Sequence, residues 1–137
     1  LTAAETGQLL FSTLHTTGAA NTVDRIVDSF PPGQQQQIRT QLSQALEGVV
    51  SQQLLPTVDG ALVPAFEVMN VTPAVRNMIR ESKAFQLESV ISTSSALGMI
   101  TMDQSILALL KAGRITRDTA LRHASNPDWM EKRFATL

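Results

Sequence analysis

The chain has no cysteine, no tyrosine and a single tryptophan among its 137 residues. Without cysteine it can form no disulfide framework, and its two histidines lie too far apart in sequence for a four-ligand zinc site to be plausible. A pI near 6.1 and few aromatic residues argue against a basic, base-stacking surface, so nucleic acid is not an expected partner. No apolar run approaches the roughly 18 residues of a membrane helix, so no transmembrane segment is expected.

No glycine is followed by lysine, so the G-x-x-x-x-G-K-[ST] loop that cradles a triphosphate is missing. This chain alone is therefore not expected to hydrolyse ATP. Its length fits one domain with a real core, and its 43% hydrophobic content argues against disorder. The first five residues lack the basic start of a signal peptide and read as the end of a helix.

Charge is unevenly distributed along the chain. Through Asn70 the only bases are Arg25 and Arg39, against six acids, whereas the remaining residues carry nine bases and six acids. Two explanations fit this difference: ordinary solvated helix faces, or complementary surfaces that meet between neighbouring subunits.

The strongest apolar run, residues 9–14, predicts a buried strand, although periodicity alone also allows a short buried helix. Polar side chains follow or end this run: Thr13, His15 and Thr16. In open α/β sheets ligands bind where strands end at their carboxyl edge, which makes these three side chains the first candidates for binding.

The remaining pattern predicts a partial sheet followed by a helical bundle, which is an α/β fold. Helices are expected over about 21–30, capped by Asn21 or Thr22, and over about 34–48. Two strands, 50–55 and 62–69, are expected to pair through an Asp59-Gly60 turn. Five helices should follow: one from Pro73 through Glu81, one with Phe85 to Ile91 on its apolar face, one ending at Gly113, one from Thr116 to His123, and one starting at Asn126.

Two motifs carry a resemblance to a known family. Residues 3–16, ending in Thr-Leu-His-Thr, and residues 24–31 are similar to the histidine box and following helix of type IV pilus and type II secretion motor ATPases. Residues 74–81, Ala-Val-Arg-Asn-Met-Ile-Arg-Glu, resemble the Ala-Ile-Arg-Asn-Leu-Ile-Arg-Glu signature of the retraction branch, the PilT family, at six of eight positions. The short 56–61 connection leaves no room for the four-cysteine zinc module common in assembly and secretion relatives.

The resemblance implies the C-terminal half of a RecA-like (P-loop NTPase-type) motor domain. Residues 1–70 would be the C-terminal part of the ATPase core, and residues 71–137 a C-terminal helical subdomain carrying the 74–81 motif. The family's phosphate-binding loop, acidic box and Walker B segment would lie before Leu1.

For the complete protein, the resemblance implies a motor that couples ATP hydrolysis to pilus retraction and twitching motility. It would use ATP and Mg²⁺, form a homo-hexamer, and act on the pilus platform from the cytoplasmic face of the inner membrane. Tight nucleotide binding by this chain alone is not expected. Two alternatives stay open: a non-catalytic interaction or regulatory module that keeps the ring-contact surfaces, and a motor of the related secretion or pilus-assembly branch.

The resemblance also assigns roles to single residues. By residue type alone, His15 is a hydrogen-bonded structural histidine; by the resemblance, it faces the terminal phosphate of ATP. Thr13 and Thr16 would orient it, or simply cap the strand end. Arg25 would form a surface salt bridge with a nearby acid, or lie near the nucleotide and the subunit boundary. Gln8 stands where the family usually has histidine and cannot take up a proton near neutral pH.

The coupling motif is the last candidate site. Arg76 and Arg80 stand four residues apart and so are expected on one solvated helical face beside Asn77 and Glu81. By the resemblance this face is a transmission or docking surface outside the ATP site, and replacing either arginine should spare folding but impair coupling. The full set is Ala74, Val75, Arg76, Asn77, Met78, Ile79, Arg80 and Glu81.

Overall fold

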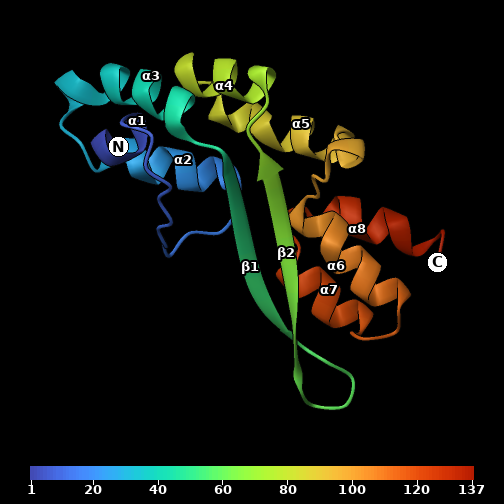
Figure 1. Ribbon diagram of the computed structural model, residues 1–137. Helices are drawn as coiled ribbons and strands as arrows, with labels where there is room; N and C mark the ends of the chain where they lie inside the picture. Colours follow the sequence, from blue (N-terminus) through green and yellow to red (C-terminus); the bar gives the residue numbers. More distant parts are fainter.

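The computed structural model describes residues 1–137 and is built around one long antiparallel hairpin, β1 (Gly48–Pro56) and β2 (Leu62–Asn70). Figure 1 shows helices α1 to α5 grouped around one end of the hairpin and α6 to α8 alongside the other. The helices are α1 (Thr2–Glu5), α2 (Ala19–Asp28), α3 (Gln35–Ala45), α4 (Pro73–Arg80), α5 (Leu87–Thr93), α6 (Met102–Lys111), α7 (Arg117–His123) and α8 (Pro127–Phe134). The expected fold class, a partial sheet followed by a helical bundle, is confirmed. None of the helices is both long and apolar enough to cross a bilayer.

The hairpin forms where the sequence predicts it, with both strands slightly longer than expected. Gly48 lies opposite Asn70 and Pro56 opposite Leu62, and the connection closes through Asp59 and Gly60. Gly60 has φ +84°, a left-handed conformation that suits glycine. The Thr57 hydroxyl donates to the Asp59 carboxylate and accepts from the Ala61 amide at 2.9 Å. The bond from Thr57 is the main reason that the pKa of Asp59 lies below its usual value, and the two bonds of Thr57 together fix the turn.

The edge of β2 that does not pair with β1 bonds to the segment just before α6 and to α6 itself. Val68 and Ile100 exchange two backbone hydrogen bonds, at 2.9 and 3.1 Å. The Phe66 amide donates to the hydroxyl of Ser105 at 3.0 Å. Strand β2 therefore lies between β1 and the C-terminal helices.

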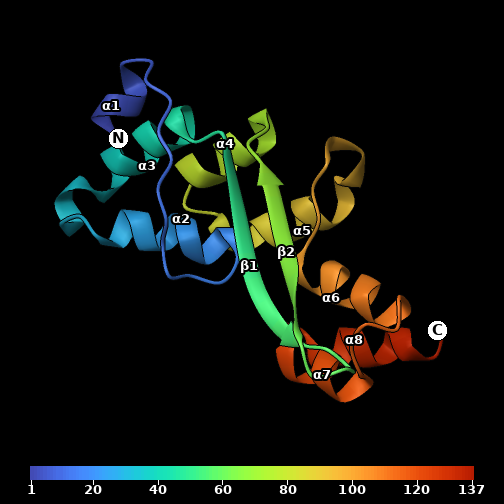
Figure 2. The ribbon, with the colours of Figure 1, turned by 60° about the horizontal axis from the view of Figure 1, so that its bottom comes forward.

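Two hydrophobic cores lie along the hairpin. The larger consists of twelve buried residues, from α2 to α5 with Met69 and Met99. The smaller contains eight: Leu55, Val63, Ala65, Met102, Ile106, Ile115, Ala120 and Met130. Figure 2 shows the corresponding helix groups separated along the strands. The expected division at residues 70 and 71 stays a prediction; helices α4 and α5 share the larger core with α2 and α3.

One row of side chains on β2 faces inward and connects the cores. Strand alternation places Val63, Ala65, Glu67 and Met69 on the same buried face. Val63 and Ala65 belong to the smaller core and Met69 to the larger. A buried acid, Glu67, therefore occupies the boundary between them.

The strand predicted over residues 9–14 is wrong, and so is the alternative of a buried helix. This segment is irregular, and Leu9 and Phe11 are 84% and 87% exposed. A strand needs a neighbour that satisfies its backbone hydrogen bonds, and in this chain β1 and β2 pair with each other instead. Phe85, expected on an apolar helix face, is also exposed.

Helix α2 begins earlier than the sequence suggests, because a glycine caps it. Gly18 is the N-cap in place of Asn21 or Thr22, and has φ +87° and ψ 150°. This backbone region is essentially restricted to glycine. The turn into α2 thus depends on Gly18.

We predict that Gly18→Ala lowers the free energy of unfolding by about 1–3 kcal/mol, because alanine is strained in that region. Urea unfolding measures the loss. Gly33→Ala is the matched control, since an added Cβ there meets nothing within 4 Å and no positive φ is required. A loss at Gly33 as large as that at Gly18 would contradict the backbone explanation.

Candidate functional site

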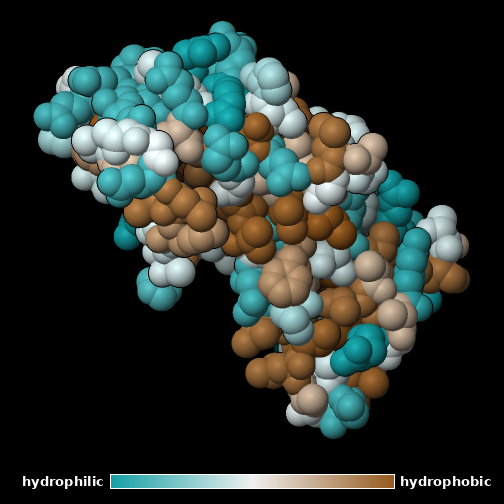
Figure 3. All heavy atoms as spheres, viewed as in Figure 1, coloured by the Kyte–Doolittle hydropathy of each residue, from teal (hydrophilic) through white to brown (hydrophobic).

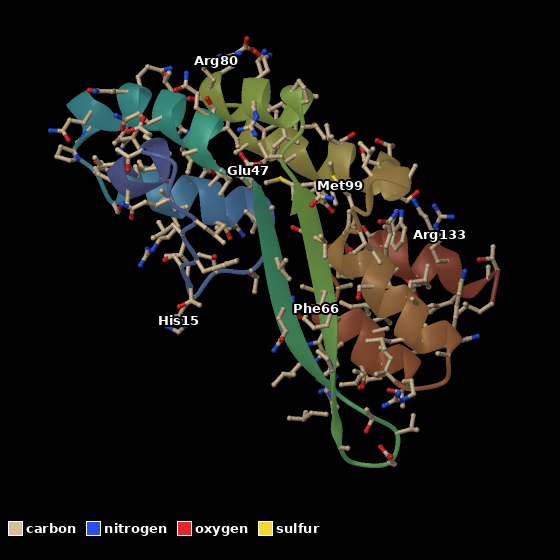
Figure 4. The ribbon with its side chains drawn as sticks, in the orientation of Figure 1. His15, Glu47, Phe66, Arg80, Met99 and Arg133 are labelled. Atoms are coloured by element: carbon tan, nitrogen blue, oxygen red, sulfur yellow. The ribbon has the colours of Figure 1, made fainter.

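His15 lies on an exposed loop that leads into α2. Figure 4 shows it projecting away from the helices, and its side chain makes no hydrogen bond. The structural interpretation, a hydrogen-bonded histidine at a strand end, is therefore wrong in this structure. Thr13 is also exposed. Neither Thr13 nor His15 therefore packs against the helices or the hairpin.

The loop is anchored just after His15. The hydroxyls of Thr16 and Thr22 are 2.8 Å apart, and Thr22 also donates to the Gly18 carbonyl at 2.9 Å. Thr16 therefore ties the loop to the first turn of α2. The amide of Ala19, the first residue of α2, donates to Glu67 Oε1 at 2.7 Å.

Glu67 is a site residue that sequence reasoning missed. Its second oxygen, Oε2, accepts from the amide of Met102, the first residue of α6, at 3.2 Å. The residue is only 8% exposed. A buried carboxylate is tolerated where backbone N–H groups bind both oxygens, and a helix N-terminus also favours negative charge. The signal was available in the sequence, because Glu67 is in phase with the apolar positions 63, 65 and 69.

Asp103, which sequence reasoning also missed, is a structural acid that repeats this bonding pattern within the C-terminal helices. Its Oδ1 accepts from the Ser125 amide at 2.7 Å and its Oδ2 from the Asn126 amide at 2.8 Å. It is 4% exposed. Because Asn126 is the N-cap of α8, Asp103 ties α6 to the start of α8.

A cavity of about 250 Å³ lies between this loop, α5 and α6. Glu67, Glu88 and Asp103 lie on its walls. Burial raises the pKa of Glu88, and the negative charges of Asp103 and Glu67 raise it further. No group of three or more histidine, aspartate or glutamate side chains is arranged to hold a metal ion.

Arg25 is exposed on α2, one turn beyond Thr22, and makes no ion pair. The surface salt bridge expected with a nearby acid does not form: Asp24 pairs with Arg39 at 3.5 Å, and Arg25 pairs with neither Asp24 nor Asp28. Its guanidinium is therefore free to meet a ligand or another subunit.

The two arginines of the 74–81 motif have different environments. Arg76 Nη1 donates to three carbonyls at the end of α3, those of Ser43, Gln44 and Leu46, at 2.8 to 3.1 Å. Its Nη2 pairs with Glu47 at 3.1 Å. The expectation that both arginines share a solvated face is therefore wrong for Arg76, which caps α3.

The rest of the motif agrees with the expected amphipathic helix. Val75 and Ile79 are fully buried in the larger core. Arg80 is exposed; its guanidinium donates to the Asn77 side chain at 2.8 Å, and its carbonyl accepts from the Gln36 side chain at 3.1 Å. Glu81 bonds Lys83 at 2.7 Å, which lowers the pKa of its carboxyl. The exposed polar residues of the motif are thus Asn77, Arg80 and Glu81, and Ala74 is exposed beside them.

Comparison with known proteins first shows the class of protein that this fold resembles. Residues 1–62 match the family described as Type II/IV secretion system protein. A crystal structure of the pilus retraction motor PilT with bound ADP superposes on the chain with a TM-score of 0.80 at 44% identity. That match covers 96% of this chain and 36% of the other, so the fold is part of a RecA-like ATPase.

Sequence relatives show the same likeness at higher identity. The chain is 53% identical to a twitching motility protein of Neisseria gonorrhoeae over 131 residues, 95% of this chain and 35% of the relative. It is 48% identical to the type IV pilus retraction ATPase PilT of Pseudomonas aeruginosa over 128 residues, 93% of this chain and 37% of the relative. The chain is thus similar to part of proteins named for twitching motility and type IV pilus retraction. It spans about a third of the length of these curated relatives.

The environments of the two motif arginines generate a prediction on stability. Arg76→Ala should lower the free energy of unfolding by about 1.5–3 kcal/mol, because it removes charge-assisted hydrogen bonds that cap α3. Arg80→Ala should change it by less than about 0.5 kcal/mol, as is usual for exposed positions. Thermal unfolding of both variants makes the comparison, and equal losses would show that Arg76 is not a structural cap.

Proposed function

We propose that this chain is the phosphate-sensing and force-transmitting part of an ATP-driven motor that retracts type IV pili. The observation that carries the proposal is His15: its imidazole is free, exposed and held on a loop anchored directly behind it. The relatives support it, since they are named for twitching motility and pilus retraction.

In this proposal His15 donates an N–H to an oxygen of the terminal phosphate and loses that partner when the phosphate leaves. Thr13 adds a hydroxyl near His15, and Thr16 fixes the loop. Arg25 lies farther along α2, where its free guanidinium reads the nucleotide or the neighbouring subunit. These groups fit a phosphate, because all of them can donate hydrogen bonds to its oxygens.

The groups that grip the triphosphate belong, in this proposal, to the longer protein. The 137 residues contain no phosphate-binding loop and their acids form no metal site. ATP, when bound with Mg²⁺, supplies the phosphate whose loss is sensed. The present chain would contribute the sensing loop, the hairpin and the motif that passes the change on.

The exposed apolar side chains support assembly into something larger. Figure 3 shows hydrophobic side chains gathered over the hairpin and beside it. They include residues of the 9–14 segment and of the outer hairpin face: Leu9, Leu10, Phe11, Leu14, Val50, Leu54, Leu62 and Phe66. We infer that the rest of the motor domain covers this surface. The opposite charges of the two chain halves would then meet between neighbouring subunits of a homo-hexamer.

The proposal places the complete motor at the cytoplasmic face of the inner membrane, where it acts on the pilus platform. There, residues 74–81 would lie outside the nucleotide site. Arg80, with Asn77 and Glu81, would present the docking surface, while Val75 and Ile79 anchor it in the core.

Nucleotide titration tests the division of labour. The 137-residue chain should show no saturable ATP binding by calorimetry, because the groups that grip phosphate lie elsewhere. The intact gene product should bind ATP under the same conditions. Tight binding by the 137-residue chain would contradict the proposal.

His15 has a test of its own in the intact gene product. His15→Gln should lower kcat for ATP about 10²- to 10³-fold, the usual cost of removing one donor to a developing charge. His123→Gln, the same substitution at the other histidine, lies on α7 and should leave kcat unchanged. An intact protein with no ATPase activity, whose deletion has no pilus phenotype, would instead favour the non-catalytic interaction module.

A further inference from the structure

The buried acid between the two cores controls where the sensing loop can lie. We infer that Glu67 is a positioning residue for His15, and that it links the loop to the start of α6. The inference rests on the proposed role of His15. Glu67 touches the loop only through a backbone amide, so it acts through the position of His15 rather than on phosphate.

The loop has few other restraints. Bonds at Thr16, Thr17 and Gly18 run within the loop and the first turn of α2. The amide of Ala19, four residues after His15, is the point where this segment bonds to the body of the protein, at Glu67 Oε1. A Cβ on Gly18 would lie 3.5 Å from the same oxygen, so the backbone of the loop passes directly over the carboxylate.

The same carboxylate holds the C-terminal helices. Oε2 accepts from Met102, and the adjacent strand residue Val68 exchanges two bonds with Ile100 just before α6. The carboxylate is rigid and planar, so a displacement of Ala19 that keeps its 2.7 Å bond must move the acceptor of Met102. Glu67 therefore gives the loop and α6 a shared reference point.

This link requires two acceptor oxygens. A glutamine at position 67 would offer one carbonyl oxygen, and its NH₂ group would face the other backbone N–H, donor against donor. Glu67→Gln therefore breaks one of the two bonds while nearly preserving the size of the side chain. The expected consequence is a loop that occupies several positions.

Asp103 supplies the matched control. It is also a buried carboxylate with one backbone amide on each oxygen, at 2.7 and 2.8 Å. Asp103 and Ser125 line the same cavity as Thr17 and Gly18, but both amides that Asp103 binds belong to the segment leading into α8, and none belongs to the loop. Asp103→Asn and Glu67→Gln should both lower the temperature of unfolding. If the role of Glu67 were only structural, Glu67→Gln and Asp103→Asn should lower kcat by the same factor.

The experiment compares both variants in the intact gene product. Glu67→Gln should lower kcat for ATP about 10- to 100-fold, as expected for a misplaced group, whereas Asp103→Asn should leave kcat nearly unchanged. In a His15→Gln background, Glu67→Gln should cause little further loss, since it acts through a side chain that is already removed. Equal losses in the two single variants, or multiplied losses in the double variant, would overturn the inference.

Hydrogen exchange supplies a readout independent of turnover. Amides of residues 16–20 should exchange faster in Glu67→Gln and at the wild-type rate in Asp103→Asn. Amides of residues 125–127 should exchange faster in Asp103→Asn and at the wild-type rate in Glu67→Gln. If Glu67→Gln does not fold, Glu67→Asp keeps the charge but shortens the reach, and must show the same pattern. Unchanged exchange at residues 16–20 overturns this inference, whereas unchanged turnover in His15→Gln overturns the proposed function instead.

Discussion

The fold depends on one buried charge that two helix N-termini satisfy. Glu67 stands on the inward face of β2, where every neighbour in its row is apolar, and a carboxylate there is stable only because Ala19 and Met102 each donate a backbone N–H. The same bonds satisfy amides that begin α2 and α6 and that have no partner within their own helices. The free-energy cost of burying the acid and the cost of leaving two helix N–H groups unpaired are therefore both removed by the same two hydrogen bonds. The position of the carboxylate, between the two cores, determines how the N-terminal helices lie relative to α6.

Two further charged groups, the half-buried Arg76 and the buried Asp103, extend this principle to both ends of the molecule. Arg76 satisfies the last carbonyls of α3, and Asp103 satisfies the amides that lead into α8. In each case a charged side chain on one helix closes the end of another. Each core is thus joined to its neighbours by directional bonds as well as by apolar packing. Such bonds determine the relative orientation of helices more strictly than hydrophobic contact, which has no preferred direction.

The local sequence pattern is sufficient to predict most helices and strands, but it is insufficient to predict the candidate site. The hairpin, the turn at Asp59 and Gly60, and the helices after Thr72, Thr116 and Asn126 were predictable, because alternation, turn residues and caps are encoded within a few positions. Residues 9–14 were not, because an apolar run becomes a strand only where another strand accepts its hydrogen bonds. Glu67 and Asp103 were overlooked, because their partners lie 35 to 48 and 22 to 23 residues away in the sequence. Helical spacing places Arg76 on a solvated face, because spacing within α4 gives no information about the end of α3 that packs beside it.

The capping of α3 by Arg76 also limits how a mechanical stroke could pass through this region. Helix α4 cannot slide along α3 without surrendering several bonds to the carbonyls of residues 43–46 at once, and the Glu47 pair connects the same guanidinium to the residue before β1. The two helices therefore form a single block joined to the base of the hairpin. In the proposed motor, a partner that pulls on Arg80 would therefore move α3 and α4 together, and the hairpin strands would carry that movement along their length.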